Sequence, residues 1–210
     1  IRDSGSSVTV KQSVKVSGVQ AEKVNGYGDT KTTITPVKEP LNDANTHFIN
    51  NQEWTIYADG TVVCQSVLLP RGNPLELLRL GYEFQFPANL GNVAYYGRGP
   101  EENYADRKSG MPLGVYKTTA KDSFFPYGRP QDCGNHEDTR WVAVTDDKGQ
   151  GLLFGSLGTP FAFSAIPYTT TELILANHPV ELPKTTDRTV LVLSAATRGL
   201  GGASCGPGPM

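Results

Sequence analysis

The 210-residue chain has little of three things: charge of one sign, long apolar runs and cysteine. Its formal net charge of −2 gives it no electrostatic attraction to nucleic acid or to an anionic membrane. No apolar run approaches the roughly 20 residues that a helix needs to span a bilayer. The cysteines, Cys64, Cys133 and Cys205, match neither a zinc-binding spacing nor a dense disulfide framework. We therefore expect no nucleic-acid partner, no membrane partner and no metal bound by this chain.

Turn-forming residues and short alternating apolar runs are abundant instead. The 23 glycines and 15 prolines favour many turns over long helices. Two runs flank Asp59-Gly60 as in a hairpin, and two more flank the turn at residues 147–149. One short helix is predicted in TTTELILAN, where Thr169 and Glu172 have the spacing of a capping box. Nine or ten strands without alternating helices predict an all-β, antiparallel sandwich.

The stretch YYGRGPEENYADRKSG concentrates charge in a few positions. Its carboxylates at 101, 102 and 106 suggest glycoside cleavage by an acid and a base, a sugar-binding loop, or a structural corner. Glu101 and Glu102 are sequence neighbours and therefore point in different directions. Nearby arginines can neutralise them. We interpret the stretch as a corner in which Arg107 pairs with a carboxylate and Asn103 bonds to the backbone.

A second polar stretch, QDCGNHEDTRW, contains several residue types that bind metals. Their spacing matches no zinc motif. We interpret the stretch as a polar turn that leads into a strand at Thr139, with Arg140 paired to a carboxylate. The candidate ligands are Asp132, Cys133, His136, Glu137 and Asp138.

Two further sets of residues leave binding alternatives open. Aromatic side chains can bury in a sandwich core or form a platform on which sugar rings stack; the candidates are Trp54, Tyr95, Tyr96, Tyr104 and Trp141. The glycine-rich end RGLGGASCGPGP is either a flexible loop or a segment that approaches a ligand closely. It lacks the Lys-Ser/Thr ending of a phosphate loop.

Taken together, these stretches resemble the C-terminal small-chain domain of bacterial β-galactosidases of glycoside hydrolase family 2. The first stretch is similar to that family's signature, the second to its following Arg-Trp segment, and TTTELILANHPVEL and RGLGGASCGPGP to its last two motifs. The resemblance covers about residues 48 to 209. The residues that carry the two leading motifs are Arg98, Gly99, Pro100, Glu102, Asn103, Tyr104, Asp106, Arg107, Arg140 and Trp141.

The resemblance implies a galactose-mutarotase-like supersandwich over residues 1–210, read as a single domain. Because the chain begins at Ile1 rather than Met, we expect it to be excised from a longer protein. A complete domain of the family is longer, so the N-terminal part is either missing or shortened. The bacterial periplasm and the cytoplasm both stay open as its location.

The resemblance also implies a division of labour in hydrolysing terminal β-D-galactosides. The catalytic glutamates and a magnesium ion belong to a separate TIM barrel, so no residue of this chain is expected to be catalytic and the chain alone is expected to be inactive. It covers the active site and contributes Gly202, Ser204 and Cys205 to the sugar pocket, Cys205 standing where the best-known members have Trp. Barrel and sandwich domains of the same protein are the expected partners; homo-oligomerisation stays open.

Two rival functions remain at this point. One is a separate carbohydrate-binding module that uses the aromatic platform. The other is a mutarotase-like sugar epimerase, whose chemistry needs a histidine acid and a glutamate base. For that reaction His178 would have to face one pocket together with Glu181 or Glu172.

Overall fold

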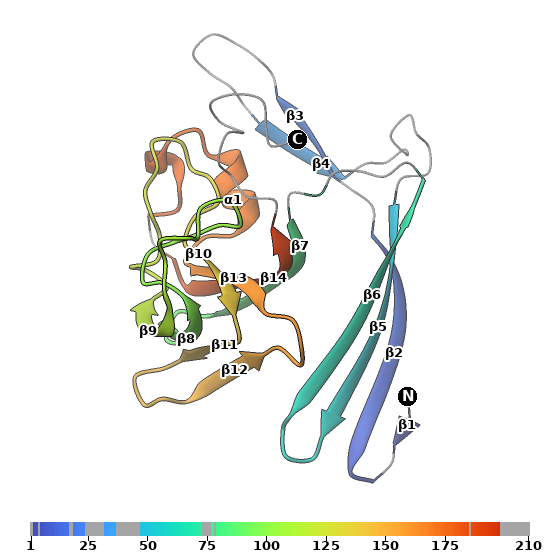
Figure 1. Ribbon diagram of the computed structural model, residues 1–210. Helices are drawn as coiled ribbons and strands as arrows, with labels where there is room; N and C mark the ends of the chain where they lie inside the picture. The colour runs from blue at the N-terminus through green and yellow to red at the C-terminus, as the bar shows by residue number, and fades with distance from the viewer. Residues whose placement is uncertain are drawn as a thin grey trace. The chain divides into compact units, whose positions relative to one another are not determined.

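The computed structural model separates into two compact units, residues 1–76 and 77–210 (Figure 1). It describes residues 2–3, 5–16, 19–23, 32–36, 47–72, 77, 79–184 and 186–197. Each unit is described by itself below. The prediction of one domain over residues 1–210 stays a prediction.

The second unit is an antiparallel β-sandwich of two four-stranded sheets. One sheet has the order β10-β13-β14-β7, and the other has the order β12-β11-β8-β9. The strands are β7 (Arg79–Pro87), β8 (Asn92–Arg98), β9 (Leu113–Thr119), β10 (Asn135–Thr139), β11 (Trp141–Thr145), β12 (Gly151–Gly155), β13 (Phe161–Ile166) and β14 (Arg188–Thr197).

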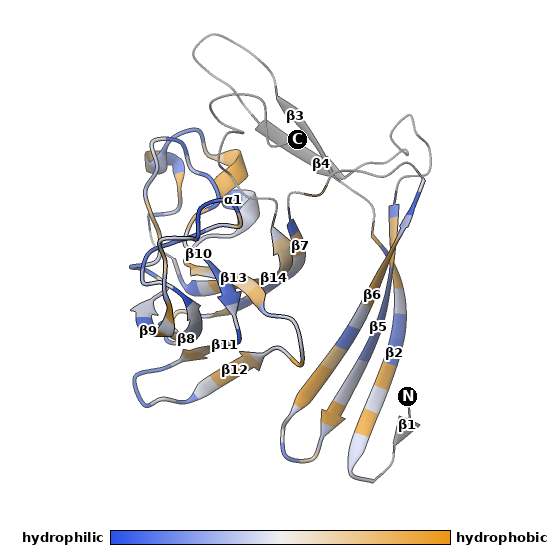
Figure 2. Cartoon of the chain, viewed as in Figure 1, coloured by the Kyte–Doolittle hydropathy of each residue, from blue (hydrophilic) through white to orange (hydrophobic). Residues whose placement is uncertain are grey.

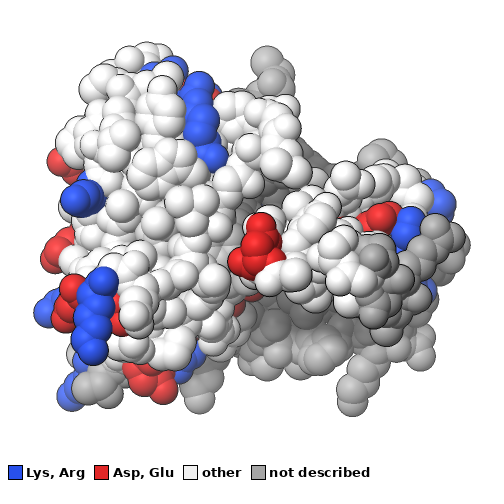
Figure 3. All heavy atoms as spheres, turned by 90° about the horizontal axis from the view of Figure 1, so that it is seen from below, with Lys and Arg blue, Asp and Glu red and all other residues white. Residues whose placement is uncertain are grey.

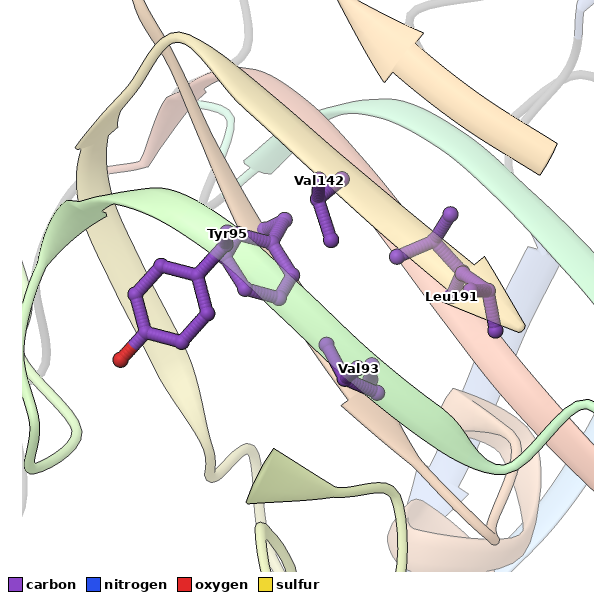
Figure 4. Packing of buried hydrophobic residues seen from close by; sticks show 7 residues of the cluster. Val93, Tyr95, Val142 and Leu191 are labelled. Atoms are coloured by element: carbon purple, nitrogen blue, oxygen red, sulfur yellow. The ribbon is translucent and has the colours of Figure 1, made fainter. Parts of the chain in front are cut away.

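The core of the sandwich lies between these two sheets (Figure 4). Tyr95 and Val142 belong to one sheet, and Phe163 and Leu191 to the other; all four are almost completely buried. Because successive residues of a strand point to opposite faces, the alternation in β8 and β11 turns one residue in two inward. Fully burying side chains of this kind stabilises the fold by about 1.5–3 kcal/mol each.

A short helix closes a smaller apolar cluster in the same unit. Helix α1 (Thr170–Leu175) begins at the predicted cap, where Thr169 and Glu172 bond reciprocally, so that prediction is confirmed. Its Leu173 packs with Cys133 and Leu182. The last of these follows the 3₁₀ helix η1 (Pro179–Glu181), in which proline occupies a first helical position.

The first unit contains a sheet of three long strands and one short strand, ordered β1-β2-β5-β6. A separate pair, β3 and β4, is antiparallel. The strands are β1 (Arg2–Asp3), β2 (Ser7–Val16), β3 (Val19–Lys23), β4 (Thr32–Pro36), β5 (His47–Tyr57) and β6 (Val62–Arg71). Hydropathy alternates along the long strands (Figure 2). None of the side chains described in residues 5–16 and 47–72 is fully buried.

The all-β antiparallel class with one short α-helix is confirmed, as are the two predicted hairpins. The predicted polar turn at 131–138 is wrong in part, because residues 135–139 form the buried strand β10. Strand β9 was not predicted. No helix in the described part of the chain is long and apolar enough to cross a bilayer.

Candidate functional site

The charged stretch at 95–110 forms a corner around the carboxylate of Glu102. The guanidinium of Arg107 and the phenol of Tyr127 both donate to Glu102 Oε1. The backbone N–H of Gly134 donates to Oε2 at 2.7 Å. A carboxylate that accepts three such bonds positions the loops around it. The predicted pairing of Arg107 with a carboxylate is confirmed.

Asn103 joins this corner to strand β10 through its backbone and its side chain. Its amide Nδ2 donates to the carbonyl oxygens of Arg98 and Glu101, each at 3.0 Å. Its Oδ1 accepts from the backbone N–H of Glu137 at 2.9 Å. Asn135 donates to the Asn103 carbonyl and accepts from the Asn103 N–H, both at 2.7 Å. The prediction that Asn103 bonds to backbone is therefore confirmed.

Asp138 binds the other side of the corner from an unusual backbone conformation. Its φ of 52° lies in the left-handed region, within the irregular pairing of β10 with β13. Its carboxylate accepts from Arg98 Nε, and from Lys108 Nζ at 2.9 Å. Burial alone would raise the pKa of Asp138, but the bonds from Arg98 and Lys108 outweigh it and lower the pKa. The strained backbone thus presents a fixed negative charge to two cations.

Strand β10 carries a run of buried polar side chains. His136 packs against the ring of Tyr95, and its Nδ1 lies 3.0 Å from both Tyr95 Oη and the Arg98 carbonyl oxygen. A carbonyl oxygen can only accept, so Nδ1 carries the hydrogen. Burial lowers the pKa of His136 to about 4. Glu137 accepts from Asn135 and from Thr197 Oγ1, the latter at 2.7 Å.

The signature glycine and tyrosine have packing roles at this corner. A Cβ on Gly99 would lie 2.4 Å from Tyr95 Oη, so only glycine fits between the rings of Tyr95 and Tyr116. Tyr104 is buried beneath the guanidinium of Arg107, 4.9 Å from its ring centroid. Burial raises the pKa of both Tyr95 and Tyr104, so both phenols stay neutral. Pro100 and Asp106 are exposed.

The Arg-Trp motif lies on the outer face of the sheet. Trp141 is the direct cross-strand neighbour of Tyr96, and both side chains point away from the core residues Tyr95 and Val142. Arg140 was expected to pair with a carboxylate. It instead donates to the backbone carbonyl of Asp138 and lies over the ring of Tyr96, 5.5 Å from its centroid. A guanidinium therefore occupies one ring face of Tyr96.

The corner therefore holds loops together and does not present an acid and a base to a substrate. Glu102, Glu137 and Asp138 each accept hydrogen bonds from fixed donors, and neutral His136 is buried. Within the described part of the chain, no three side chains of His, Cys, Asp or Glu come close enough to hold a metal ion. Basic and acidic side chains are interspersed over the face in Figure 3, and several of opposite sign lie side by side.

The pair proposed for epimerase chemistry, His178 with Glu181, lies at the surface. His178 Nδ1 lies 3.1 Å from Glu181 Oε1, and both side chains are exposed. A cavity of about 600 Å³ in the second unit is lined by other residues, among them Phe124, Tyr168 and Lys121. The residues predicted to reach the sugar pocket, Gly202, Ser204 and Cys205, lie outside the described residues.

Several members of this network have no local signal in the sequence. Tyr127 binds Glu102 from 25 positions away, and His136 is buried although its neighbours are polar. All five residues of β10 are polar, a composition typical of an exposed turn, which explains the wrong prediction there. The glycine at position 134 was a partial signal of a special backbone conformation before β10. In the structure its φ is 68°, a conformation that favours glycine.

The fold and the corner define a class: an all-β protein whose described part contains a structural polar network. Comparison with known proteins identifies the family. The beta galactosidase small chain family matches residues 3–210, and the chain belongs to it. The match extends over both units.

Three relatives illustrate how this chain corresponds to larger proteins. The chain is 39% identical over 139 residues to a β-galactosidase of Priestia megaterium. The aligned stretch covers 66% of this chain and 13% of that protein. It is 48% identical over 124 residues to β-galactosidase BgaC of Bifidobacterium adolescentis. Here the aligned stretch covers 58% of this chain and 12% of that protein. A β-galactosidase small subunit of Latilactobacillus sakei is 38% identical over 159 residues, 71% of this chain and 49% of that subunit.

Proposed function

We propose that this chain is the non-catalytic small-chain region of a β-galactosidase that hydrolyses terminal β-D-galactosides. The observation that carries the proposal is the family match over residues 3–210, together with the 12–13% of two relatives that the chain spans. The remainder of such a protein would contain the barrel and sandwich domains. The carboxylates of the polar corner accept hydrogen bonds from fixed donors, and this supports a structural role.

In this proposal the catalytic glutamates and the magnesium ion belong to a glycoside hydrolase family 2 barrel outside the chain. The described residues of this chain do not bring together a set of ligands that fits a magnesium ion. The chain would adopt a galactose-mutarotase-like supersandwich within the larger enzyme. Gly202, Ser204 and Cys205 would reach the galactoside pocket, where a thiol at 205 offers no ring face for stacking.

A replacement experiment tests this function. Residues 1–210 replace the matching stretch of the Priestia megaterium enzyme, and hydrolysis of a chromogenic galactoside is compared for the chimera, the deletion and the 210-residue chain alone. We expect an active chimera, an inactive chain and a loss of about 100-fold or more on deletion, because small misplacements of a site cost that much. Hydrolysis by the purified chain alone would reject the proposal.

Free-standing carbohydrate binding is the second candidate, since Tyr96 and Trp141 are neighbours on an outer sheet face. The guanidinium of Arg140 over Tyr96 disfavours it, because a stacked sugar needs an open ring face. Titration calorimetry of the 210-residue chain with galactose decides between the two. Saturable binding abolished by Trp141→Ala would favour the module.

A further inference from the structure

The outer face of the sheet β12-β11-β8-β9 is apolar where a solvent-facing sheet is ordinarily polar. The cross-strand register places Leu153, Ala143, Ala94 and Lys117 in one row. The next row contains Gly155, Trp141, Tyr96 and Val115. We call this surface the outer face; its apolar members are Leu113, Val115, Ala94, Tyr96, Trp141, Ala143 and Leu153.

Four apolar members of the outer face are exposed, and Ala94, Trp141 and Ala143 are partly exposed. The exposed fractions of Leu153 and Val115 are 67% and 63%, and Leu113 and Tyr96 are also exposed. Single exposed apolar residues are ordinary, but a contiguous set across four strands marks an interaction surface. The neighbouring inner residues Tyr95 and Val142 are buried, so both sides of this one sheet are apolar.

The strands of the outer face carry basic residues only, and the nearby aspartates Asp122 and Asp147 lie in the flanking turns, bonded to Thr119 and Asn92. The sequences of β8, β9, β11 and β12 contain no aspartate or glutamate. Lys117 extends the first row, and Arg140 lies over Tyr96. Arg98 is already engaged by Asp138. A complementary partner would therefore bring an apolar surface with carboxylates at its rim, opposite Lys117 and Arg140.

We propose that the outer face is the surface by which this chain docks onto the larger, catalytic part of a β-galactosidase. This inference rests on the proposed function. The relatives indicate which partner covers the outer face. Two of them are about eight times longer than the stretch they share with this chain, and a third is by name a separate small subunit. A separate subunit needs a surface that holds without a covalent link, which an apolar centre with a charged rim provides.

Side-chain footprinting with hydroxyl radicals tests the docking surface. Reactivity at Leu153 and Val115 is compared between the 210-residue chain and the Priestia megaterium chimera. Val180 in η1 is the matched control, because it is also an exposed valine, 79% exposed, and lies outside the outer face. We expect at least a fivefold loss of reactivity at Leu153 and Val115 in the chimera, with Val180 unchanged.

A matched pair of substitutions gives the second readout. Val115→Glu and Val180→Glu each place a carboxylate at an exposed valine, so neither should shift the melting temperature of the 210-residue chain by more than about 2 °C. In the chimera, Val115→Glu should make the small-chain region at least tenfold more sensitive to limited proteolysis. Val180→Glu should leave that sensitivity unchanged.

The outcomes separate the two proposals. If the chimera is active but Leu153 and Val115 are unprotected, or Val180 is protected equally, the outer face is not the docking surface. The proposed function would still stand in that case. An inactive chimera with an unprotected outer face rejects both. If the 210-residue chain alone sediments as a dimer that Val115→Glu dissociates, the occupant is a second copy and the assignment to a catalytic partner is wrong.

Discussion

The sheet of residues 1–76 and the sandwich of residues 77–210 are built from strands with similar apolar alternation, yet their interiors differ. In the second unit, Val142 and Leu191 have no exposed surface. In the first unit, no described side chain reaches that level of burial, and Val14 is 40% exposed. Alternation therefore decides which side chains share a face. Burial depends on whether a second layer packs on that face.

A second contrast concerns polar residues. The described polar side chains of the first unit are at least partly exposed. In the second unit Asn103, Asn135 and Thr139 are essentially inaccessible and bonded within the protein. Buried polar groups with complete hydrogen bonding specify one arrangement, whereas incomplete ones are costly. The hydrogen bonds of Asn103 thus tie the corner to strand β10 in the second unit.

Each unit contains one tryptophan, Trp54 and Trp141, which makes the comparison measurable. In a Trp54→Phe chain, fluorescence reports on the second unit alone. In a Trp141→Phe chain, it reports on the first. Denaturant unfolding followed in these two backgrounds gives a free energy of unfolding for each unit.

The largest expected effect is the pH dependence that His136 confers on the second unit. Its pKa is lowered to about 4 in the folded state, so the unfolded chain, with a histidine pKa near 6.5, binds the proton first. The stabilisation is complete above pH 6.5 and is lost as pH falls toward 4. The loss should be about 3 kcal/mol.

His136→Asn in the Trp54→Phe background is the control for this effect. Carboxylates titrate in both proteins, so the difference between the two pH profiles isolates the histidine. Parallel profiles from pH 7.5 to 4 would show that His136 is not buried in its neutral form.

A matched pair of valines gives the next effect. Val142→Ala removes packed methyl groups from the core and should lower the free energy of unfolding of the second unit by about 2 kcal/mol. Val14→Ala in the first unit should cost less than about 0.5 kcal/mol, because the side chain already contacts water. Equal losses at the two positions would mean that the face carrying Val14 is packed as tightly as the sandwich core.

The smallest effect tests the polar corner. Arg107→Ala removes one of three donors to Glu102, but Tyr127 and the Gly134 N–H remain. Because Arg107 is half-exposed, we expect a loss of about 1 kcal/mol in the second unit. Arg129→Ala, at an exposed arginine, is the control and should change stability by less than about 0.5 kcal/mol. An unchanged melting temperature for Arg107→Ala would contradict the anchoring role of the corner.

Much of the architecture was predictable because its signals are local. Asp59-Gly60 and the turn at 147–149 place glycine at positive φ, as Gly60 and Gly149 have. The Thr169–Glu172 cap spans four residues. Strand β10 was not predictable in this way, because its burial depends on Asn103, which is 32 positions from Asn135.

The sequence by itself determined the all-β class, the hairpins, the capped helix and the family, since periodicity, turn residues and motif order are properties of neighbouring positions. Only the tertiary structure decided that residues 135–139 are buried, that Glu102 is bound by Tyr127 and that Arg140 covers Tyr96. Those outcomes depend on donors and surfaces brought together from distant positions, Thr197 reaching Glu137 across 60 residues. The free energy of burying a polar group depends on those partners rather than on the group's own residue type.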